Sequence, residues 1–338
     1  MPAQADIDQP RQARRRRCVV HIGLNKTGST TIQGWLGANR DQLAEQGIRY
    51  DALADAGPRT LPHALGFSAI GVHRAGRLLP NPDARLNFGI ETLEDQAAPM
   101  AEFEARAEAS INAPGYRTYV ISSEFLPAWL RKPEWTRLFH DWLTLRFDKV
   151  RYVVYLRDQI SWVPSAFAQM IKMGGVYSME EFLERKEDRD YFKTCARWRR
   201  GTPNSRLTVR LLEADSLING DLIEDFANLI GASTENTRAP KTLNESIDAA
   251  SLEPLRQINL LADKFPEKWT RAVRSGHVQK MIGSSTGKKL TLTRAQALGV
   301  ARRNAASNEK LRKRFFPERP VLFARSHALL TQSQEDAD

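Results

Sequence analysis

The residues best suited to chemistry in this sequence follow a short apolar segment near the N-terminus. Residues 18–22 are apolar apart from one histidine, Gly23 comes next, and Lys26 begins the run Lys-Thr-Gly-Ser-Thr-Thr. A buried strand, a glycine turn and a helix start direct backbone N–H groups and the positive end of the helix dipole to one point. With a lysine beside them, these groups are suited to bind a phosphate-bearing nucleotide.

The lysine does not have the position that it has in ATPase loops. A Walker A motif, G-x-x-x-x-G-K-[ST], places lysine directly after its second glycine. Gly23 and Gly28 have the spacing of the two glycines, but Ser29 follows Gly28 and Lys26 lies two residues before it. The order K-[ST]-G-[ST]-[ST] instead resembles the 5′-phosphosulfate loop of sulfotransferases that use 3′-phosphoadenosine 5′-phosphosulfate (PAPS).

A second group of polar residues follows an apolar segment in the middle of the chain. Residues 150–156 are continuously apolar after one arginine, as expected of a strand covered on both faces, and Arg157 follows directly. Ser165 lies eight residues beyond Arg157. The arginine could bind a phosphate through two charged hydrogen bonds and the serine could give the same phosphate a neutral one. This spacing resembles the 3′-phosphate motif of the same sulfotransferases, with Gln159 in place of the usual proline. An ion pair between Arg157 and Asp158 is the alternative.

The candidate for proton transfer follows a third apolar segment, residues 118–122. In cytosolic sulfotransferases the corresponding strand carries K-[ST]-H-L-P with histidine as the catalytic base, and the resemblance puts Glu124 in that position, with Ser122 in place of the lysine. A positioned base typically contributes ~10²–10⁴ in rate. His63 is a competing base, and a helix cap or an ion pair is the alternative role for Glu124.

Together the three segments resemble the PAPS-dependent sulfotransferase family, in a bacterial-type branch. The resemblance implies transfer of a sulfuryl group from PAPS to a hydroxyl or amine of an acceptor such as a glycan, a lipid or a small molecule. It also implies that Arg157 and Ser165 bind the 3′-phosphate, that Glu124 or His63 accepts the proton, and that no metal takes part. The residues implied for the 5′-phosphosulfate are Lys26, Thr27, Gly28, Ser29, Thr30 and Thr31.

The hydrophobic pattern predicts the elements that position these residues. Helical stretches of more than a dozen residues separate the apolar runs, so we expect parallel strands joined by crossovers. The expected fold is α/β, a three-layer P-loop-like parallel sheet flanked by helices, and ligands bind such sheets at the carboxyl ends of the strands. Strands are expected at 18–23, 48–50, 118–122, 150–156 and 207–212, and helices at 29–47, 98–112 and 220–230.

The same pattern predicts the organisation of the chain. Residues 1–17 are expected to form a flexible basic tail, and residues 18–240 an α/β domain. Residues 57–99 are rich in Gly, Pro and Asn, which favours a loop-rich insert on the acceptor side of the site. Residues 241–338 contain no strand pattern, so we expect a mainly helical region packed on the same domain.

Composition limits the classes of protein and partner. The 338 residues are 41% hydrophobic and 27% charged, as in ordinary globular proteins, and no apolar run approaches the ~20 residues of a membrane-spanning helix. Two cysteines and no apolar leader segment favour a cytoplasmic protein. The net charge of +10 is concentrated near both ends and permits peripheral contact with a membrane. No nucleic-acid-binding signature accompanies it, so a nucleic-acid partner is not expected.

Two other functions remain open at this level. A P-loop kinase or NTPase using ATP would need a lysine after Gly28 and an acidic strand end for magnesium, and Ser29 and Arg157 disfavour both requirements. A non-enzymatic protein that binds polyanions through its basic segments would show steeply salt-dependent binding and would not need Lys26.

Overall fold

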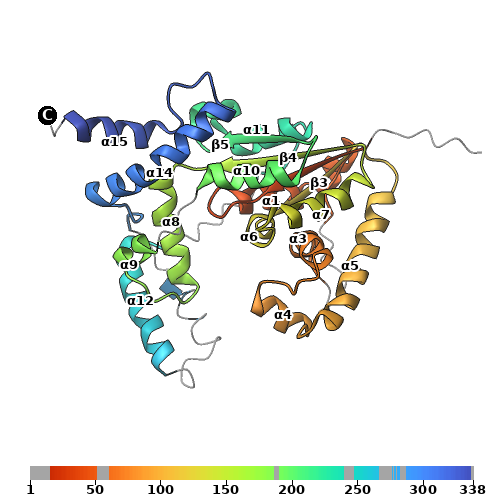
Figure 1. Cartoon of the computed structure of the whole chain (residues 1–338), viewed down its shortest axis with the longest axis horizontal. Helices are drawn as coiled ribbons and strands as arrows, with labels where there is room; N and C mark the ends of the chain where they lie inside the picture. Colours follow the sequence, from red (N-terminus) through yellow and green to blue (C-terminus); the bar gives the residue numbers. More distant parts are fainter. Residues whose placement is uncertain are drawn as a thin grey trace, which may run out of the picture.

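The structure, a computed structural model, describes residues 16–51, 61–185, 190–239, 247–265, 276, 278, 280–281 and 287–335. Within them lies one five-stranded sheet of order β2-β3-β1-β4-β5, and all of its pairings are parallel (Figure 1). The expected α/β fold class is confirmed. The strands are β1 Arg17–Ile22, β2 Ile48–Arg49, β3 Thr118–Ser123, β4 Lys149–Leu156 and β5 Arg206–Leu211.

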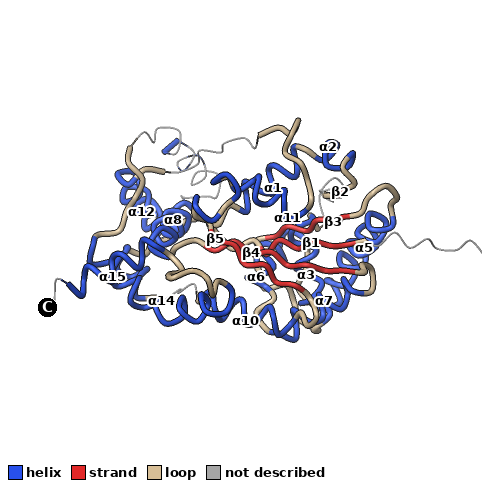
Figure 2. Tube along the Cα trace, turned by 90° about the horizontal axis from the view of Figure 1, so that it is seen from above, coloured by secondary structure: helices blue, strands red, loops and turns tan. Residues whose placement is uncertain are grey.

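Helices cover both faces of the sheet and complete three layers (Figure 2). On one face Val19 and Val153 pack with Trp35 and Phe226, which belong to α1 Ser29–Ala38 and α11 Leu222–Ile230. On the other face β1, β3 and β4 pack mainly against five helices in a second, larger apolar core. These helices are α3 His63–Arg74, α5 Leu93–Asn112, α6 Phe125–Trp129, α7 Pro133–Thr144 and α10 Tyr191–Gly201.

A group of helices lies beyond the carboxyl end of β4, on the left of Figure 1. Ile171 and Leu255 are fully buried in its separate apolar core, where α12 and α14 pack on α8. In the described part of the chain no strand follows β5. The members of this group are α8 Gln159–Lys172, α9 Met179–Glu184, α12 Ala249–Lys264, α14 Arg294–Phe315 and α15 Ala324–Glu335.

Three expected elements differ from the structure. The helix expected at 29–47 is broken at Asn39 into α1 and α2 Arg40–Glu45, because the Asn39 side chain bonds the Trp35 carbonyl and both backbone groups of Arg238. Helix α5 begins five residues before the expected start, at a capping box formed by Thr92 and Asp95. The insert contains α3 and α4 Pro82–Phe88 and is more helical than its composition suggests, while its residues 57–60 lie outside the described residues.

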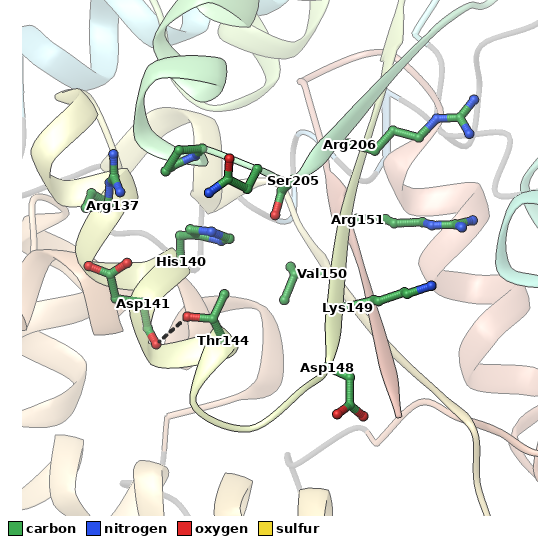
Figure 3. A pocket seen from close by; sticks show the side chains of 12 residues that line it. Arg137, His140, Asp141, Thr144, Asp148, Lys149, Val150, Arg151, Ser205 and Arg206 are labelled. Carbon is green, nitrogen blue, oxygen red and sulfur yellow. Dashed lines mark hydrogen bonds between the residues drawn. The ribbon is translucent and has the colours of Figure 1, made fainter. Parts of the chain in front are cut away.

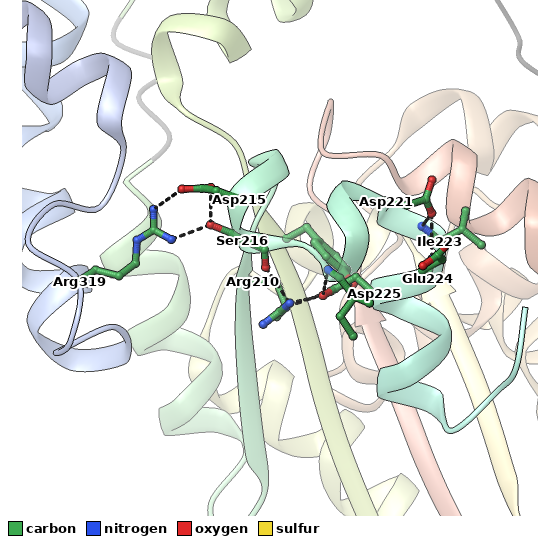
Figure 4. Close-up of polar contacts among 10 residues, drawn as sticks. Arg210, Asp215, Ser216, Asp221, Ile223, Glu224, Asp225 and Arg319 are labelled. Atoms are coloured by element: carbon green, nitrogen blue, oxygen red, sulfur yellow. Dashed lines mark hydrogen bonds and ion pairs between the residues drawn. The ribbon is translucent and has the colours of Figure 1, made fainter.

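Helix α11 is fixed to the sheet by a buried carboxylate. Asp225 is 1% exposed, forms an ion pair with Arg210 of β5 and accepts a hydrogen bond of 2.7 Å from the Tyr155 hydroxyl of β4 (Figure 4). A second bridge joins the C-terminal segment to the loop after β5, where Arg319 contacts Ser216 at 2.6 Å and Glu213 at 3.3 Å. Short η helices Ala214–Ser216 and Ile218–Gly220 connect β5 to α11. These contacts hold the outer strand in register beside β4.

None of the described helices combines the length with the apolar composition that a membrane crossing requires.

Candidate functional site

The loop after β1 turns sharply next to the end of β3. The Gly23 amide donates to the Ser123 carbonyl at 3.0 Å, and a Cβ atom on Gly23 would lie 2.8 Å from Ser29 Oγ and 3.0 Å from the Glu124 amide nitrogen. Only glycine permits so close an approach. The loop and Glu124 are therefore neighbours at the carboxyl edge of the sheet.

Two hydroxyls inside the loop are used to hold its shape. Thr27 is fully buried and its Oγ1 donates to the Leu24 carbonyl at 2.7 Å, while Ser29 Oγ donates to the same oxygen at 3.2 Å. Thr30 and Thr31 are exposed in the first turn of α1, where backbone N–H groups have no partner within the helix. The loop thus presents the amides and outer hydroxyls of the helix start to solvent.

Lys26 adopts a backbone conformation that favours glycine. Its φ is 62°, in the left-handed region, and Gly28 follows with φ of 88°. The Lys26 ammonium donates to Gln169 Oε1 of α8 at 2.9 Å. Trp162 of α8 also contacts this loop, because its indole N–H donates to the Asn25 carbonyl at 2.8 Å. Helix α8 therefore holds both the backbone and the lysine of the loop.

Arg157 at the end of β4 joins the second motif to this loop. Its Nη1 donates to Ser165 Oγ at 3.1 Å and to the Lys26 carbonyl at 3.4 Å. Its own carbonyl accepts from the Tyr191 hydroxyl at 2.7 Å. The structure thus brings together Arg157, Ser165 and the Lys26 loop, which are separated by up to 139 residues in the sequence.

The alternative role of Arg157, an ion pair with Asp158, does not occur. Asp158 is 5% exposed, and its carboxylate accepts from the Ile160 amide at 2.9 Å and from Ser326 Oγ at 2.7 Å, so it caps α8 and anchors α15. No carboxylate among the described residues lies within ion-pair distance of Arg157. Burial is the main cause that lowers the pKa of Arg157 below its ordinary value. A half-buried cation of this kind gains from an anionic ligand.

Glu124 has neither of the alternative roles considered for it. It stands at the N-cap of α6 but its side chain makes no cap hydrogen bond, and it forms no ion pair within the described residues. Its Oε2 accepts a hydrogen bond of 3.0 Å from Gln33 Nε2 of α1. The carboxylate is half-buried beside the loop and is held by a neutral donor.

His63, the competing base, begins α3 on the same side of the site. It is 3% exposed, and its ring packs at 4.9 Å from Tyr50 and 4.8 Å from Phe67. Burial lowers the pKa of His63 to about 3 and raises that of Tyr50 to about 12. After burial, the charge of Glu124 adds to the rise in the pKa of Tyr50. A neutral imidazole with so low a pKa is a weak proton acceptor at neutral pH.

Three residues that position the site were missed in the sequence. Gln33 and Tyr50 lie outside the matching motifs, and only the fold places them against Glu124 and His63. Gln169 could have been found, because it lies four residues after Ser165 and so shares its face of α8.

Among the residues that the structure describes, no group of three or more histidine, cysteine or acidic side chains could hold a metal ion.

Comparison with known proteins gives two similarities. No protein-family model matches the chain. An uncharacterized protein of Archaeoglobus fulgidus is 26% identical over 180 residues, which are 53% of this chain and 48% of that protein, so the chain spans about half the length of this relative. The crystal structure of a sulfotransferase from Alicyclobacillus acidocaldarius aligns with 78% of this chain and 96% of its own, at 16% identity and a TM-score of 0.41.

The buried histidines predict a loss of stability in acid. The pKa of both His21 and His63 is lowered to about 3 from 6.5, mainly by burial, so the unfolded chain binds more protons between these values. The free energy of unfolding should therefore fall as pH decreases from about 6.5, by up to about 1.4 kcal/mol per pH unit for each histidine. Urea unfolding of wild type and His63→Phe between pH 7 and pH 5 measures this, since the variant lacks the contribution of His63.

Protonation of carboxylates also lowers the free energy of unfolding in acid, and it does so in both proteins. The prediction therefore concerns the difference between wild type and His63→Phe in how steeply the free energy of unfolding changes with pH. His327→Gln changes an exposed histidine and should leave the slope unaltered. Coincident slopes for wild type and His63→Phe would contradict the burial of a neutral His63.

Proposed function

We propose that this protein is a sulfotransferase that moves a sulfuryl group from PAPS to a hydroxyl or amine of its acceptor. The observation that carries the proposal is the contact of Arg157 with both Ser165 and the Lys26 carbonyl. Two sets of anion-binding groups, at the ends of neighbouring strands β1 and β4, meet at this point. A nucleotide with phosphates on both its 3′ and 5′ positions fits two such sets, whereas a single phosphate uses only one.

The residues at the loop would hold the 5′ end of the donor. The backbone amides from Thr27 to Thr31 and the exposed hydroxyl of Thr30 surround the helix start, where anions bind favourably. The Ser29 hydroxyl would support them by holding the loop through the Leu24 carbonyl. PAPS supplies an activated sulfuryl group when bound. Lys26 stabilises negative charge on the departing phosphate, and its contact with Gln169 shows that α8 can set the direction of the ammonium.

The 3′-phosphate would bind Arg157 and Ser165. In the structure described here Arg157 already donates to Ser165 Oγ at 3.1 Å, so the two groups are preorganised at one place. Arginine provides a planar fork for phosphate oxygens and serine provides a neutral donor. Arg157 and Ser165 would therefore make a nucleotide with a 3′-phosphate bind more tightly than one without it.

We assign proton transfer to Glu124. It lies next to the loop, and Gln33 orients its carboxylate through a bond of 3.0 Å without neutralising its charge. An acceptor hydroxyl or amine between Glu124 and the donor would lose its proton to this carboxylate as the new bond to sulfur forms. His63, whose pKa is lowered to about 3, would shape the acceptor side by packing with Tyr50.

The ATP-dependent alternative is less well supported by the strand ends. Asp158, the acidic residue nearest the end of β4, is engaged in capping α8 and in binding Ser326. It therefore does not offer a free carboxylate for magnesium. Cys18 and Cys195 are both free and buried, which agrees with our proposal that the enzyme acts in the reducing cytoplasm.

Thermal unfolding with two nucleotides tests the proposed donor. Adenosine 3′,5′-bisphosphate, the donor without its sulfuryl group, should raise the melting temperature by several degrees at about 100 times its Kd, which corresponds to about 2.7 kcal/mol. ATP with magnesium at the same concentration should give a much smaller rise. Equal shifts, or a larger one with ATP, would overturn the assignment to sulfuryl transfer.

A further inference from the structure

The opposite end of the sheet carries a row of positive charges that the proposed function does not use. Five basic residues lie at or next to the N-terminal ends of four neighbouring strands. We call them the basic edge: Arg117, Arg17, Lys149, Arg151 and Arg206. In the register of the sheet Arg17 pairs with Lys149, and Arg151 pairs with Arg206. Since neighbouring strands lie ~4.8 Å apart, the basic edge extends over roughly 15 Å.

Four of these side chains share one face of the sheet. Side chains alternate along a strand, so the register puts Lys149, Arg151 and Arg206 on the side of Arg17. Figure 3 shows Lys149, Arg151 and Arg206 pointing in one direction, away from His140. Helix α11 covers this face up to its end at Ile230, whose carbonyl accepts from Arg17 Nη2 at 2.8 Å. The basic edge thus begins where the covering helix ends.

The charges of the basic edge are not compensated within the described residues, where none of the five forms an ion pair. Further along the same face of β5, Arg210 is paired with Asp225. The pKa of Arg17 is lowered, first by burial and then by the charges of Arg151 and Arg117. Like charges held this close repel one another, and a bound anion would relieve that repulsion.

Two cavities adjoin the row. One of about 520 Å³ has Lys149, Arg151 and Arg206 among its lining residues, but their charged ends point away from His140, which lines the same cavity (Figure 3). The carboxylates Asp141 and Asp148 also belong to this lining. The Asp148 carboxylate already accepts the Arg16 amide at 2.7 Å. The other cavity, of about 320 Å³, has Arg17 and Arg117 in its lining and no carboxylate. This end of the sheet is therefore hollowed as well as basic.

The shape and chemistry of the basic edge indicate its ligand. The described linings of both cavities contain no phenylalanine, tyrosine or tryptophan, on which proteins stack the bases of single-stranded nucleic acids. A row of single charges at the spacing of the strands, with a cavity at Arg17 and Arg117, matches a chain with regularly spaced anions better than a flat bilayer. We propose that the basic edge binds an acidic polysaccharide through its sulfate or carboxylate groups.

This site is separate from the proposed donor site. The strands between them are six to eight residues long, which places roughly 20 Å between the basic edge and the Lys26 loop. The inference rests on the register and the uncompensated charges, so it holds whether or not the protein transfers sulfuryl groups.

Binding of a fluorescent heparin oligosaccharide to the full chain tests the proposal. If heparin binds through three ionic contacts, raising the salt concentration from 50 to 200 mM should lower the affinity about 40-fold, by analogy with counterion release from nucleic acids. The double variant Arg151→Glu/Arg206→Glu should bind at least tenfold more weakly and show a shallower salt dependence. The control Lys310→Glu/Arg314→Glu makes the same change of charge at two exposed positions of α14 and should bind like wild type.

The outcomes separate the possible ligands. An equal loss in both double variants would mean that net charge alone attracts heparin and would overturn the proposal. Tighter binding of a dT20 oligonucleotide, or of vesicles containing phosphatidylserine, than of heparin would also overturn it. An unchanged shift with adenosine 3′,5′-bisphosphate in Arg151→Glu/Arg206→Glu would show that the donor site remains intact.

Discussion

Replacing Glu124 by glutamine is expected to lower the rate of sulfuryl transfer by about 10²–10⁴-fold, the usual contribution of a positioned general base. Glutamine keeps the size of the side chain and an oxygen that can accept the bond from Gln33 Nε2, now 3.0 Å from Glu124 Oε2. It removes the negative charge that takes up the proton. The loss should therefore appear in kcat, while the affinity for adenosine 3′,5′-bisphosphate stays within about twofold of wild type.

The measurement uses ³⁵S-labelled PAPS with an acceptor selected from hydroxyl and amine compounds by the same assay. His63→Phe is the matched comparison, because phenylalanine keeps the ring contacts with Tyr50 and Phe67 but cannot bind a proton. We expect it to retain most of the turnover, since burial lowers the pKa of His63 to about 3. Normal turnover in Glu124→Gln together with a large loss in His63→Phe would make His63 the base.

The sheet and the positions of the main site residues follow from short-range features of the sequence. Residues 152–156 are apolar because both faces of this part of β4 are covered, and Arg157 falls at the strand end because that is where the apolar run stops. Its distance of eight residues from Ser165 spans the end of a strand and two turns of a helix, so the spacing predicted that the two side chains lie near each other, and in the structure they are 3.1 Å apart. Glycine at position 23 predicted a tight turn, and the structure adds that the turn passes close to the backbone of Ser123 and Glu124.

Other features depend on contacts between distant segments, which local patterns do not reveal. The break at Asn39 results from its bonds to Arg238, 199 residues away. The orientation of Glu124 by Gln33 requires α1 and the end of β3 to meet. The basic edge could not be found without the strand register, because Arg17, Arg151 and Arg206 lie far apart in the sequence and become neighbours only when the strands pair.

Removing the arginine at the end of β4 is expected to abolish the preference for a 3′-phosphate. Arg157→Ala should weaken the binding of adenosine 3′,5′-bisphosphate at least tenfold, because hydrogen bonds to a charged group contribute about 1.5–3 kcal/mol. Binding of adenosine 5′-monophosphate, which lacks the 3′-phosphate, should change little. Isothermal titration of both nucleotides with wild type and variant gives the four dissociation constants needed.

Two further variants test whether Arg157 itself recognises the 3′-phosphate. Lys26→Ala removes the cation of the 5′ loop, so it should weaken both nucleotides and leave their ratio unchanged, whereas Ser165→Ala should reduce the ratio by less than Arg157→Ala does. Arg199→Ala, at an exposed arginine of α10, is the control and should alter neither constant. A similar weakening of both nucleotides by Arg157→Ala would mean that Arg157 supports the loop through the Lys26 carbonyl rather than binding the 3′-phosphate. The ratio of the two affinities therefore separates a role in recognition from a role in holding the loop.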